Sequence, residues 1–423
     1  MVSKRVLLSI SIGLCFIMLS GCMKKATFSS PSYEIVSGEE LTFFIVSDPH
    51  YISKRTYDEN EAFENFCCSN DGKLLNYADE IMDTFIWEVS NKRPDFLIVS
   101  GDLSCNGEKE SHLDFAKKLE DIENQGTCVY VIPGNHDIDN PWAGNYIGKE
   151  PCKAESITTQ DFSEIYNSFG YDEAISRDEH SLSYLVMPSK DLWLLMLDST
   201  KKNDSRFSNA PEINGMISPE TLKWIEQCSV MAKENNAQLI ASMHHSLLPH
   251  NSVINKGYVI DNSLEVINVF QELGIEVVLT GHIHLQSIKS HIVDDYRLYD
   301  IATGSILAYP NLYGELKYCP NSGFEYNSHR IDVENWALNN KIEDENMSNF
   351  NDYSLDYFEN RSFEKYYAAI AEKLSDAEKD YFEIMAKTVA KLNLGYFKGL
   401  RNAELVSTVS STEYNMLIST LPD

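Results

Sequence analysis

The strongest constraint on the fold is a pattern that occurs five times, in which an apolar run of four to six residues ends directly before a group of polar side chains. One run, residues 127–132, leads through Pro133 and Gly134 into Asn135 and His136. An apolar run that stops at a turn and then presents polar groups is typical of a buried strand with functional side chains at its carboxyl end. Helical periodicity appears between the runs, so we predict an α/β fold whose strand ends meet at one edge.

The polar groups that follow the five runs are all carboxylates, imidazoles or an amide. In chain order they are Asp48 and His50, Asp102, Asn135 and His136, His244 and His245, and His282 and His284. Six of the eleven histidines lie at these run ends, whereas histidines with only structural roles would be scattered along the chain. Each residue alone is compatible with a turn or a core position. The set as a whole indicates one shared site.

Apolar patterning also predicts the individual elements. Strands are predicted at residues 41–46, 96–99, 127–132, 181–186, 192–197, 239–243 and 275–280, and helices at about 74–90, 108–124, 160–169 and 263–273. A further helix should begin after Ser218, which would cap it, with Pro219 at its first position. The loop 138–178 is long for a plain connection, so we expect it to form part of the wall or lid of the site. Residues 201–217 are a polar insertion, and we expect both segments to determine the shape of the pocket.

The polar groups suit a pair of divalent metal ions. Carboxylate and imidazole ligands favour Mn, Fe or Zn, and no thiolate lies near the runs. A carboxylate has two oxygens and can bridge two ions, and Asp102 follows a central run, so we expect Asp102 to be the bridge. With Asp48, Asp102 and a shared hydroxide, two dications leave a local charge of about +1, which can hold a phosphate oxygen.

The composition makes this local charge necessary for any anionic substrate. Without Lys4 and Arg5, the chain has 33 basic and 64 acidic residues, a formal net charge of −31. Such a surface repels nucleic acids and anionic lipid headgroups, so we expect no nucleic-acid binding. Bound cations are the simplest source of the positive charge that an anionic substrate needs.

The first residues indicate export. Lys4 and Arg5 precede an apolar stretch, residues 6–19, which is short for a transmembrane helix and is followed by Ser20-Gly21-Cys22. Together with Leu19, these residues resemble the lipobox of bacterial lipoproteins. The resemblance implies a signal peptide at residues 1–21, lipid modification of Cys22, a tether over 22–39, and anchoring on the outer face of the bacterial cell membrane. An uncleaved signal anchor is the alternative.

The five run ends also resemble a known family. In order and spacing, Asp48-x-His50, Gly101-Asp102, Gly134-Asn135-His136-Asp137, Met243-His244-His245 and Gly281-His282-x-His284 look like the five motifs of the calcineurin-like metallophosphoesterases. The resemblance covers about residues 40–335 and extends to exported bacterial class III cyclic-nucleotide phosphodiesterases. It implies a sandwich of two mixed β-sheets flanked by helices, with two metal ions at the strand ends.

Carried over residue by residue, the resemblance assigns a role to each group. One ion would be held by Asp48, His50, Asp102 and His284, and the other by Asp102, Asn135, His244 and His282. His136 would not be a ligand. It would face the substrate, stabilising the transition state or protonating the leaving oxygen, while a metal-bridging hydroxide attacks in line.

Two neighbouring residues are assigned to supporting positions. Where close relatives often have His-His-Pro-Pro, this chain has His244-His245-Ser246-Leu247. We assign the ligand to His244 because it is nearer the strand end, and His245 to a supporting position. Asp137 either orients a neighbouring imidazole or caps the turn, and the sequence leaves both readings open.

The choice of ester depends on cations near the motifs. A phosphomonoester carries nearly two charges and usually meets additional Lys or Arg, whereas the cations near the motif ends all lie in polar loops: Lys54, Arg55, Lys201, Lys202 and Arg206. This favours a phosphodiester, with cyclic nucleotides as candidates. A phosphomonoesterase or nucleotidase is the alternative. A non-catalytic surface lipoprotein is a third reading, but such a protein would be expected to lose ligands or His136, and none is missing.

The last part of the chain differs from the rest. Helical spacing runs from Ser362 to Leu392, and Ser375 with Glu378 three residues later resembles a capping box that starts a second helix. We therefore predict a catalytic domain over 40–338 and a helical C-terminal domain over 339–423, as occurs on some exported members of the family. Our hypothesis is that this domain packs near the rim of the site and narrows access to it.

Overall fold

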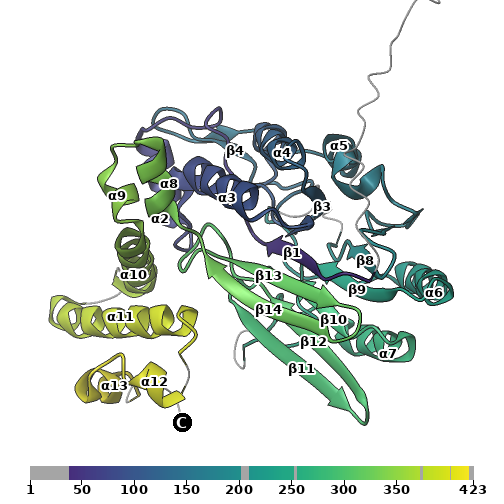
Figure 1. Ribbon diagram of the computed structural model, residues 1–423. Coiled ribbons are helices and arrows are strands. Elements are labelled where there is room, and N and C mark those ends of the chain that lie inside the picture. Colours follow the sequence, from purple (N-terminus) through teal and green to yellow (C-terminus); the bar gives the residue numbers. More distant parts are fainter. Residues whose placement is uncertain (1–37, 202–208, 252–254, 372–374, 401, 419–423) are drawn as a thin grey trace, which may run out of the picture. The chain divides into compact units, whose positions relative to one another are not determined.

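The computed structural model describes residues 38–201, 209–251, 255–371, 375–400 and 402–418 (Figure 1). The expected signal peptide, Cys22 and nearly all of the expected tether lie outside these ranges. None of the helices in the described ranges has the length and apolar character needed to cross a membrane.

The first sheet has five strands and presents three carboxyl ends at one edge. In spatial order the strands are β14 (Gly323–Arg330), β13 (Leu312–Cys319), β1 (Leu41–Val46), β2 (Phe96–Ser100) and β3 (Cys128–Ile132). Strands β1, β2 and β3 are parallel, and β13 and β14 are antiparallel to their neighbours. Val46 pairs with Val99, and Ser100 pairs with Ile132. The residues that follow the three parallel strands therefore emerge side by side.

The second sheet has seven strands and is also mixed. In spatial order the strands are β11 (Ser287–Val293), β12 (Tyr296–Ala302), β10 (Val277–Thr280), β9 (Gln238–Met243), β8 (Leu192–Leu197), β7 (Tyr184–Val186) and β6 (Ser176–Arg177). The four central strands, from β12 to β8, are parallel. A separate pair is formed by β4 (Gly144–Asn145) and β5 (Cys152–Lys153). The expected fold class, with two mixed sheets and flanking helices, is confirmed.

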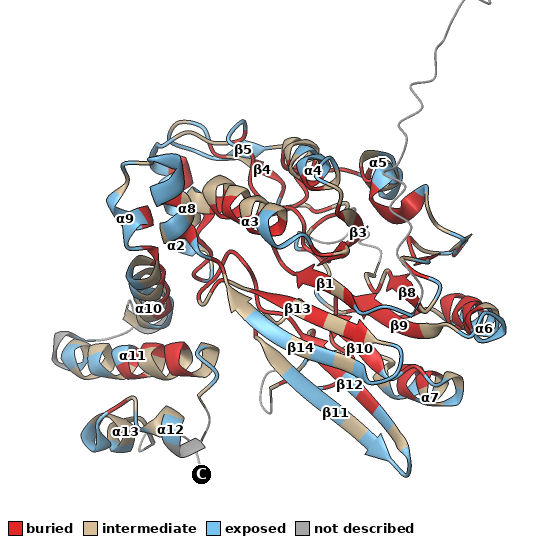
Figure 2. Cartoon of the chain, in the orientation of Figure 1, coloured by how far each residue is buried: buried red, intermediate tan, exposed pale blue. Residues whose placement is uncertain are grey.

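Strand β8 shows how the sheets are packed, because both of its faces are buried. Leu192, Leu194 and Met196 belong to the core shared with the first sheet. The alternate residues Trp193, Leu195 and Leu197 pack in a second core with the helices on the other side. Side chains on a strand alternate between faces, so a continuous apolar run with both faces covered indicates a central strand. Figure 2 shows β1, β8 and β9 buried, whereas β11 and β14 are largely exposed.

Helices flank the sheets and connect the strands. They are α2 (Glu61–Ser69), α3 (Ala78–Lys92), α4 (Lys109–Glu123), α5 (Thr159–Ile165), α6 (Pro219–Glu234) and α7 (Ser263–Leu273), with short helical segments η1 (Leu75–Tyr77) and η2 (Asn167–Tyr171). Helix α4 packs against α3 and β3, and α6 packs against α7 and β9. As predicted, the Ser218 Oγ caps α6 by accepting a hydrogen bond from the Thr221 amide at 3.0 Å.

The C-terminal part is helical, as predicted. Its helices are α8 (Val333–Asn340), α9 (Glu345–Ser348), α10 (Phe350–Ala371), α11 (Asp376–Phe397), α12 (Asn402–Val406) and α13 (Ser411–Ile418). The predicted capping box is present at the start of α11, where the Glu378 carboxylate accepts a hydrogen bond from the Ser375 amide and a further one from the Ser375 hydroxyl. The predicted domain boundary at residue 338 falls within α8.

Several element bounds differ from the prediction for local reasons. Strand β7 begins at Tyr184 and not at Ser181, because the Ser181 hydroxyl bonds the side chains of Asp178 and Ser183 and forms a turn. Helix α10 begins twelve residues before Ser362, since the polar residues in its first turns obscure the apolar spacing. Helix α2 was not predicted.

Candidate metal centre

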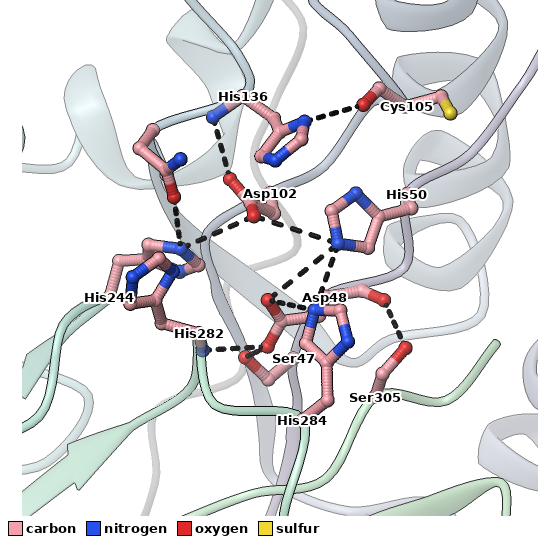
Figure 3. A network of polar contacts seen from close by, with 12 residues as sticks. Ser47, Asp48, His50, Asp102, Cys105, His136, His244, His282, His284 and Ser305 are labelled. Carbon is pink, nitrogen blue, oxygen red and sulfur yellow. Dashed lines mark hydrogen bonds and ion pairs between the residues drawn. The ribbon is translucent and has the colours of Figure 1, made fainter. Parts of the chain in front are cut away.

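Strand ends from both sheets converge on one group of side chains (Figure 3). Asp48 and His50 follow β1, Asp102 follows β2, and Asn135 and His136 follow β3. The second sheet supplies the other three, with His244 after β9 and both His282 and His284 after β10. Ligand atoms lie within 4.8 Å of one another in two groups, Asp48-His50-Asp102-His284 and Asp102-His244-His282. The two groups contain the histidines and carboxylates that were expected as ligands, and their role as ligands remains a prediction.

Asp102 belongs to both groups. Its Oδ2 lies 3.6 Å from the His50 Nε2 and 3.4 Å from the His244 Nε2. Its Oδ1 accepts a hydrogen bond from the His136 amide at 2.8 Å. One carboxylate oxygen is therefore directed between imidazoles of the two groups, which is the position that a bridging ligand needs.

Asp48 has a buried oxygen that a cation would satisfy. Its Oδ2 accepts hydrogen bonds from the Ser47 hydroxyl at 2.6 Å and the His282 amide at 2.9 Å. Its Oδ1 lies 3.3 Å from the His284 Nε2 and has no well-aligned hydrogen bond from any described residue. Buried carboxylate oxygens are normally paired. This oxygen and the surrounding imidazoles fit a divalent ion.

Hydrogen bonds fix which nitrogen of two histidines can bind a metal. The His244 Nδ1 lies 2.9 Å from the Ser100 carbonyl, and the His282 Nε2 lies 2.9 Å from the Gly257 carbonyl. A carbonyl only accepts, so these nitrogens carry the protons. The other nitrogens, Nε2 of His244 and Nδ1 of His282, remain for a metal. The Asn135 Oδ1 lies 3.2 Å from the His244 Nε2, which places this amide oxygen beside the second group.

The Asp102 carboxylate and the His244 imidazolium each stabilise the charged form of the other. Burial raises the pKa of Asp102, but the charges of His244 and His136 outweigh it and hold this pKa well below its usual value. Burial lowers the pKa of His244, but the Asp102 carboxylate raises it overall to about 9. Burial and the charge of His244 lower the pKa of His282 to about 4. A metal that binds this group therefore displaces a proton from His244.

Backbone strain is concentrated at the expected ligands. Asp48, His50, Asp102, His282 and His284 have φ angles of 51°, 37°, 50°, 68° and 55°. Non-glycine residues rarely adopt this left-handed conformation, which costs roughly 1–3 kcal/mol each when it persists at functional sites. Tight turns of this kind aim successive side chains from one strand end into the same space.

His136 lies beside both groups and belongs to neither. Its Nδ1 is 2.9 Å from the Cys105 carbonyl and 3.1 Å from the Asn106 Oδ1. Its ring meets the His50 ring edge-on, with centroids 4.9 Å apart. Because the carbonyl only accepts, Nδ1 carries a proton and Nε2 is left for the substrate. This position agrees with the predicted role of His136.

Asp137 and His245 lie behind the expected ligands. The Asp137 carboxylate accepts hydrogen bonds from the amides of Leu103, Ser104 and Gly134, so it ties together the loops after β2 and β3. This geometry favours the capping reading of Asp137. The His245 ring is buried and hydrogen-bonds the Ser199 hydroxyl through Nδ1 at 2.9 Å, so His244 and not His245 joins the group of possible ligands.

Sequence reasoning missed several residues near the centre. Ser47 and Ser305 hydrogen-bond the Asp48 carboxylate and carbonyl, and only the position of Ser47 next to Asp48 gave a signal. Lys73 is buried and its charge acts on His50 and His136. Nothing in its local sequence distinguishes it from a lysine in a solvated turn.

Two cavities reach the centre and share no lining residue. The larger, about 500 Å³, has Asn135 in its wall together with residues of the two long loops, as expected. The smaller, about 200 Å³, is lined by His282 and His284 and by side chains of α10 and α11, including Arg361 and Lys365. The C-terminal helices thus lie at the rim of the centre, as we hypothesised.

Comparison with known proteins identifies the class to which this centre belongs. Residues 41–286 match the family described as calcineurin-like phosphoesterase, and the chain belongs to this family. Residues 332–423 match a second family, described as the C-terminal domain of cyclic nucleotide phosphodiesterase. Membership of this family agrees with the expected enzyme class, a metal-dependent phosphoric ester hydrolase with two divalent ions, and the activity of this chain remains a prediction. The roles of the individual residues remain predictions.

Particular relatives agree with this class. The chain is 25% identical over 201 residues to the probable cyclic nucleotide phosphodiesterase PSM_A2567 of Pseudoalteromonas sp. (strain SM9913). The match covers 47% of this chain and 59% of that protein, less than two thirds of its length.

Solved structures of lower similarity also match. A dimetal phosphatase from Danio rerio is 11% identical, with a TM-score of 0.45, over 69% of this chain and 99% of that one. Purple acid phosphatase PPD1 from yellow lupin (Lupinus luteus) seeds is 12% identical, with a TM-score of 0.44, over 70% of this chain and 52% of that one.

Proposed function

We propose that the chain is a phosphodiesterase that hydrolyses phosphodiesters, cyclic nucleotides among them. The observation that carries the proposal is the pair of ligand groups that share Asp102, with His136 beside them and outside both. The match of residues 332–423 and the similarity to a probable cyclic nucleotide phosphodiesterase support the choice of ester.

The side chains would have separate roles in metal binding and in proton transfer. Asp48, His50, Asp102 and His284 would hold one ion, and Asp102, Asn135, His244 and His282 the other. When bound, two divalent ions neutralise charge on the phosphate and activate water near neutral pH. Burial lowers the pKa of His136, and the charge of the Asp102 carboxylate offsets part of this decrease. Its imidazolium would therefore readily give the Nε2 proton to a leaving alkoxide, while the Cys105 carbonyl holds Nδ1.

The loop cations do not by themselves decide between diester and monoester. Lys54 pairs with Asp79 and Glu80, Arg55 with Asp114, and Lys201 with Asp261. Lys202 and Arg206 lie outside the described residues.

The sequence argument for a diester considered only cations in the loops near the motifs, and the structure places other cations near the centre. Arg361 and Lys365 line the smaller cavity, although both are ion-paired, and the charge of Lys73 acts on His50 and His136. These cations favour the alternative reading of a phosphomonoesterase. Preference for a diester therefore rests on the family matches.

A substrate comparison tests the proposal. Purified protein loaded with Mn should hydrolyse bis(4-nitrophenyl) phosphate and cyclic nucleotides faster than 4-nitrophenyl phosphate and nucleoside monophosphates. His136→Ala should lower turnover by about 10²–10⁴-fold while the bound metal, measured by mass spectrometry, is retained. Faster hydrolysis of the monoesters under the same metal loading would favour the alternative function.

We also propose that the chain is exported and lipid-anchored at Cys22. Support comes from Lys4, Arg5 and the apolar stretch before Ser20-Gly21-Cys22. The protein expressed in a bacterium should partition into the detergent phase, and Cys22→Ser should move it to the aqueous phase. Cys15→Ser, within the apolar stretch, is the matched control and should have no effect. Equal partitioning of the two variants would refute lipid modification at Cys22.

A further inference from the structure

Lys73 is a buried lysine without an ionic partner. The residue is 7% exposed, and in the described ranges of the chain its ammonium forms neither an ion pair nor a hydrogen bond. Lysine is almost never buried unless it is paired, because desolvating an uncompensated charge is costly. The retention of such a residue calls for a partner that binds from solution.

Lys118 shows how a half-buried lysine of this chain is paired. Its side chain is 13% exposed, and its ammonium lies 2.7 Å from the Asp79 carboxylate and 2.5 Å from that of Asp83. Lys73 is therefore buried without the carboxylate partners that the half-buried Lys118 has.

The backbone holds Lys73 against the wall of the smaller cavity. Lys73 forms a β-bridge with Ala308, and the next amide, that of Leu74, donates to the Leu307 carbonyl at 2.9 Å. Ala308 and Asp71 both line the smaller cavity, together with His282 and His284. Lys73 is thus fixed between two residues that face the cavity beside the metal centre.

The charge of Lys73 acts on the side of the centre where the ester should react. After burial, Lys73 is the largest cause that lowers the pKa of His50, and it also lowers the pKa of His136. The rings of these two histidines are in edge-on contact. The charge of Lys73 also lowers the pKa of Asp71, whose carboxylate already pairs with Lys365 and compensates the ammonium only in part. Bound divalent ions would add to the repulsion that the ammonium experiences here, so a further anion would be attracted to it.

The smaller cavity is suited to an anion. Its wall carries Arg361 and Lys365, with Asp71 as a carboxylate that pairs with Lys365. The terminal nitrogens of Arg361 pair with the Glu364 carboxylate, and its buried Nε has no hydrogen-bond partner among the described residues. By contrast, the wall of the larger cavity contains three carboxylates, Asp139, Glu179 and Asp198, and one lysine. An anionic group is therefore favoured on the side of Lys73.

We propose that Lys73 is a substrate-binding residue whose ammonium contacts the phosphoryl oxygens of the ester, on the side of the centre formed by His50 and His136. The inference rests on the proposed phosphoesterase function. It adds a substrate-binding residue that lies outside all five family motifs. The phosphoryl group is the partner that the Lys73 ammonium lacks, and inorganic phosphate presents the same oxygens.

Two variants of the Mn-loaded protein test this assignment. Lys73→Met should bind inorganic phosphate at least about tenfold more weakly in calorimetry, because a charge-assisted hydrogen bond is lost. Lys118→Met, the matched control, should bind phosphate within about twofold of the unsubstituted protein, since it lies outside the cavity. Thermal unfolding should show the opposite order: Lys118→Met loses two ion pairs and unfolds at a lower temperature, whereas Lys73→Met is as stable as the unsubstituted protein or more stable.

Three results would overturn the assignment: undiminished phosphate affinity in Lys73→Met, loss of bound metal in that variant, or no phosphate binding by the unsubstituted protein. Loss of metal would mean that Lys73 acts on the centre and not on the phosphate. Phosphate binding that depends on Lys73, in a protein that hydrolyses no ester, would support the assignment and refute the proposed function. The two failures are therefore distinguishable.

Discussion

At the scale of single residues, the centre depends on groups that never touch a metal. The Asp137 carboxylate is fully buried and accepts hydrogen bonds from three backbone amides and from the Ser104 hydroxyl. The loops it joins carry Asp102 and Asn135. A single carboxylate thus sets the distance between two strand ends of the first sheet, which is the distance that the expected ligands must keep.

Replacement of Asp137 should destabilise the protein more than replacement of an ordinary carboxylate. Asp137→Ala leaves three buried amides without acceptors, so we expect the free energy of unfolding to fall by roughly 3–5 kcal/mol. Asp95→Ala is the control, because the Asp95 carboxylate accepts one amide, that of Thr42, and should cost about 1 kcal/mol. Urea denaturation measures both values. Equal decreases in the free energy of unfolding of the two variants would contradict the inference that Asp137 joins the two loops.

A glycine next to the ligands should be intolerant of any side chain. A Cβ at Gly281 would overlap the Ser47 hydroxyl and lie 2.7 Å from the Asp48 Oδ2. Gly281→Ala should therefore displace Asp48 and reduce the metal bound after dialysis, as measured by mass spectrometry. Gly304→Ala is the control, since the nearest atom to its Cβ would be 3.4 Å away, and it should retain metal. Full metal content in Gly281→Ala would show that the loop adjusts.

At the scale of elements, α10 is the helix that connects the C-terminal part to the centre. It approaches the segment before Lys73 closely, because a Cβ at Gly72 would lie 2.7 Å from the Phe358 ring, and Gly72 has a φ of 77°. The ion pair between Lys365 and Asp71 adds a polar contact at the cavity wall. These contacts support the hypothesis that the C-terminal helices narrow access to the centre.

Two of the lysine ion pairs on α10 and α11 allow a matched test of this hypothesis. Lys365→Gln removes a cation from the cavity wall and should raise the KM for a phosphodiester about two- to tenfold, with little change in kcat. Lys387→Gln removes a similarly exposed cation that pairs with Glu383 outside the cavity, and should leave both constants unchanged. Steady-state kinetics at constant ionic strength measures the difference. Identical constants for the two variants would argue against substrate contact by α10.

The elements that could be predicted from the sequence are those with a strong local pattern. Residues 263–273 form α7 with the predicted bounds, and 41–46 form β1, because their apolar periodicity is unambiguous. The polar residues after the five apolar runs indicated the site, since parallel strands bring their carboxyl ends to one edge of a sheet. Lys73 and Arg361 were missed because only tertiary packing brings residues so distant in sequence to the centre. In the sequence, residues 70–73 resemble a polar turn. In the structure, Ala308 and α10 pack against them.

At the scale of the whole molecule, each expected ion takes ligands from both sheets. Asp48, His50 and Asp102 come from the first sheet, and the fourth ligand of that group, His284, comes from the second. The second group likewise combines Asp102 with His244 and His282. Metal binding should therefore stabilise the packing of one sheet on the other.

Removal of metal should lower the thermal stability of the whole protein. A ligand present at one hundred times its dissociation constant stabilises the folded state by about 2.7 kcal/mol, so chelation should lower the melting temperature by roughly 2–4 °C. Differential scanning fluorimetry with and without EDTA measures the shift. Asp102→Asn, which removes the shared carboxylate charge, should show little further change on chelation. An unchanged melting temperature in the fully loaded protein would contradict stabilisation of the sheet packing.

The distribution of ligands over two sheets also makes the centre a removable cross-link. A metal bound by Asp48 and His284 closes a loop of more than two hundred residues, much as a disulfide would, and restricts the chain while it stays bound. Local opening of either sheet at this edge requires the metal to leave first. Proteases cut chains that open, so the lifetime of the protein in a metal-poor medium is expected to be shorter, and the rate of its digestion becomes a measure of the metal available around it.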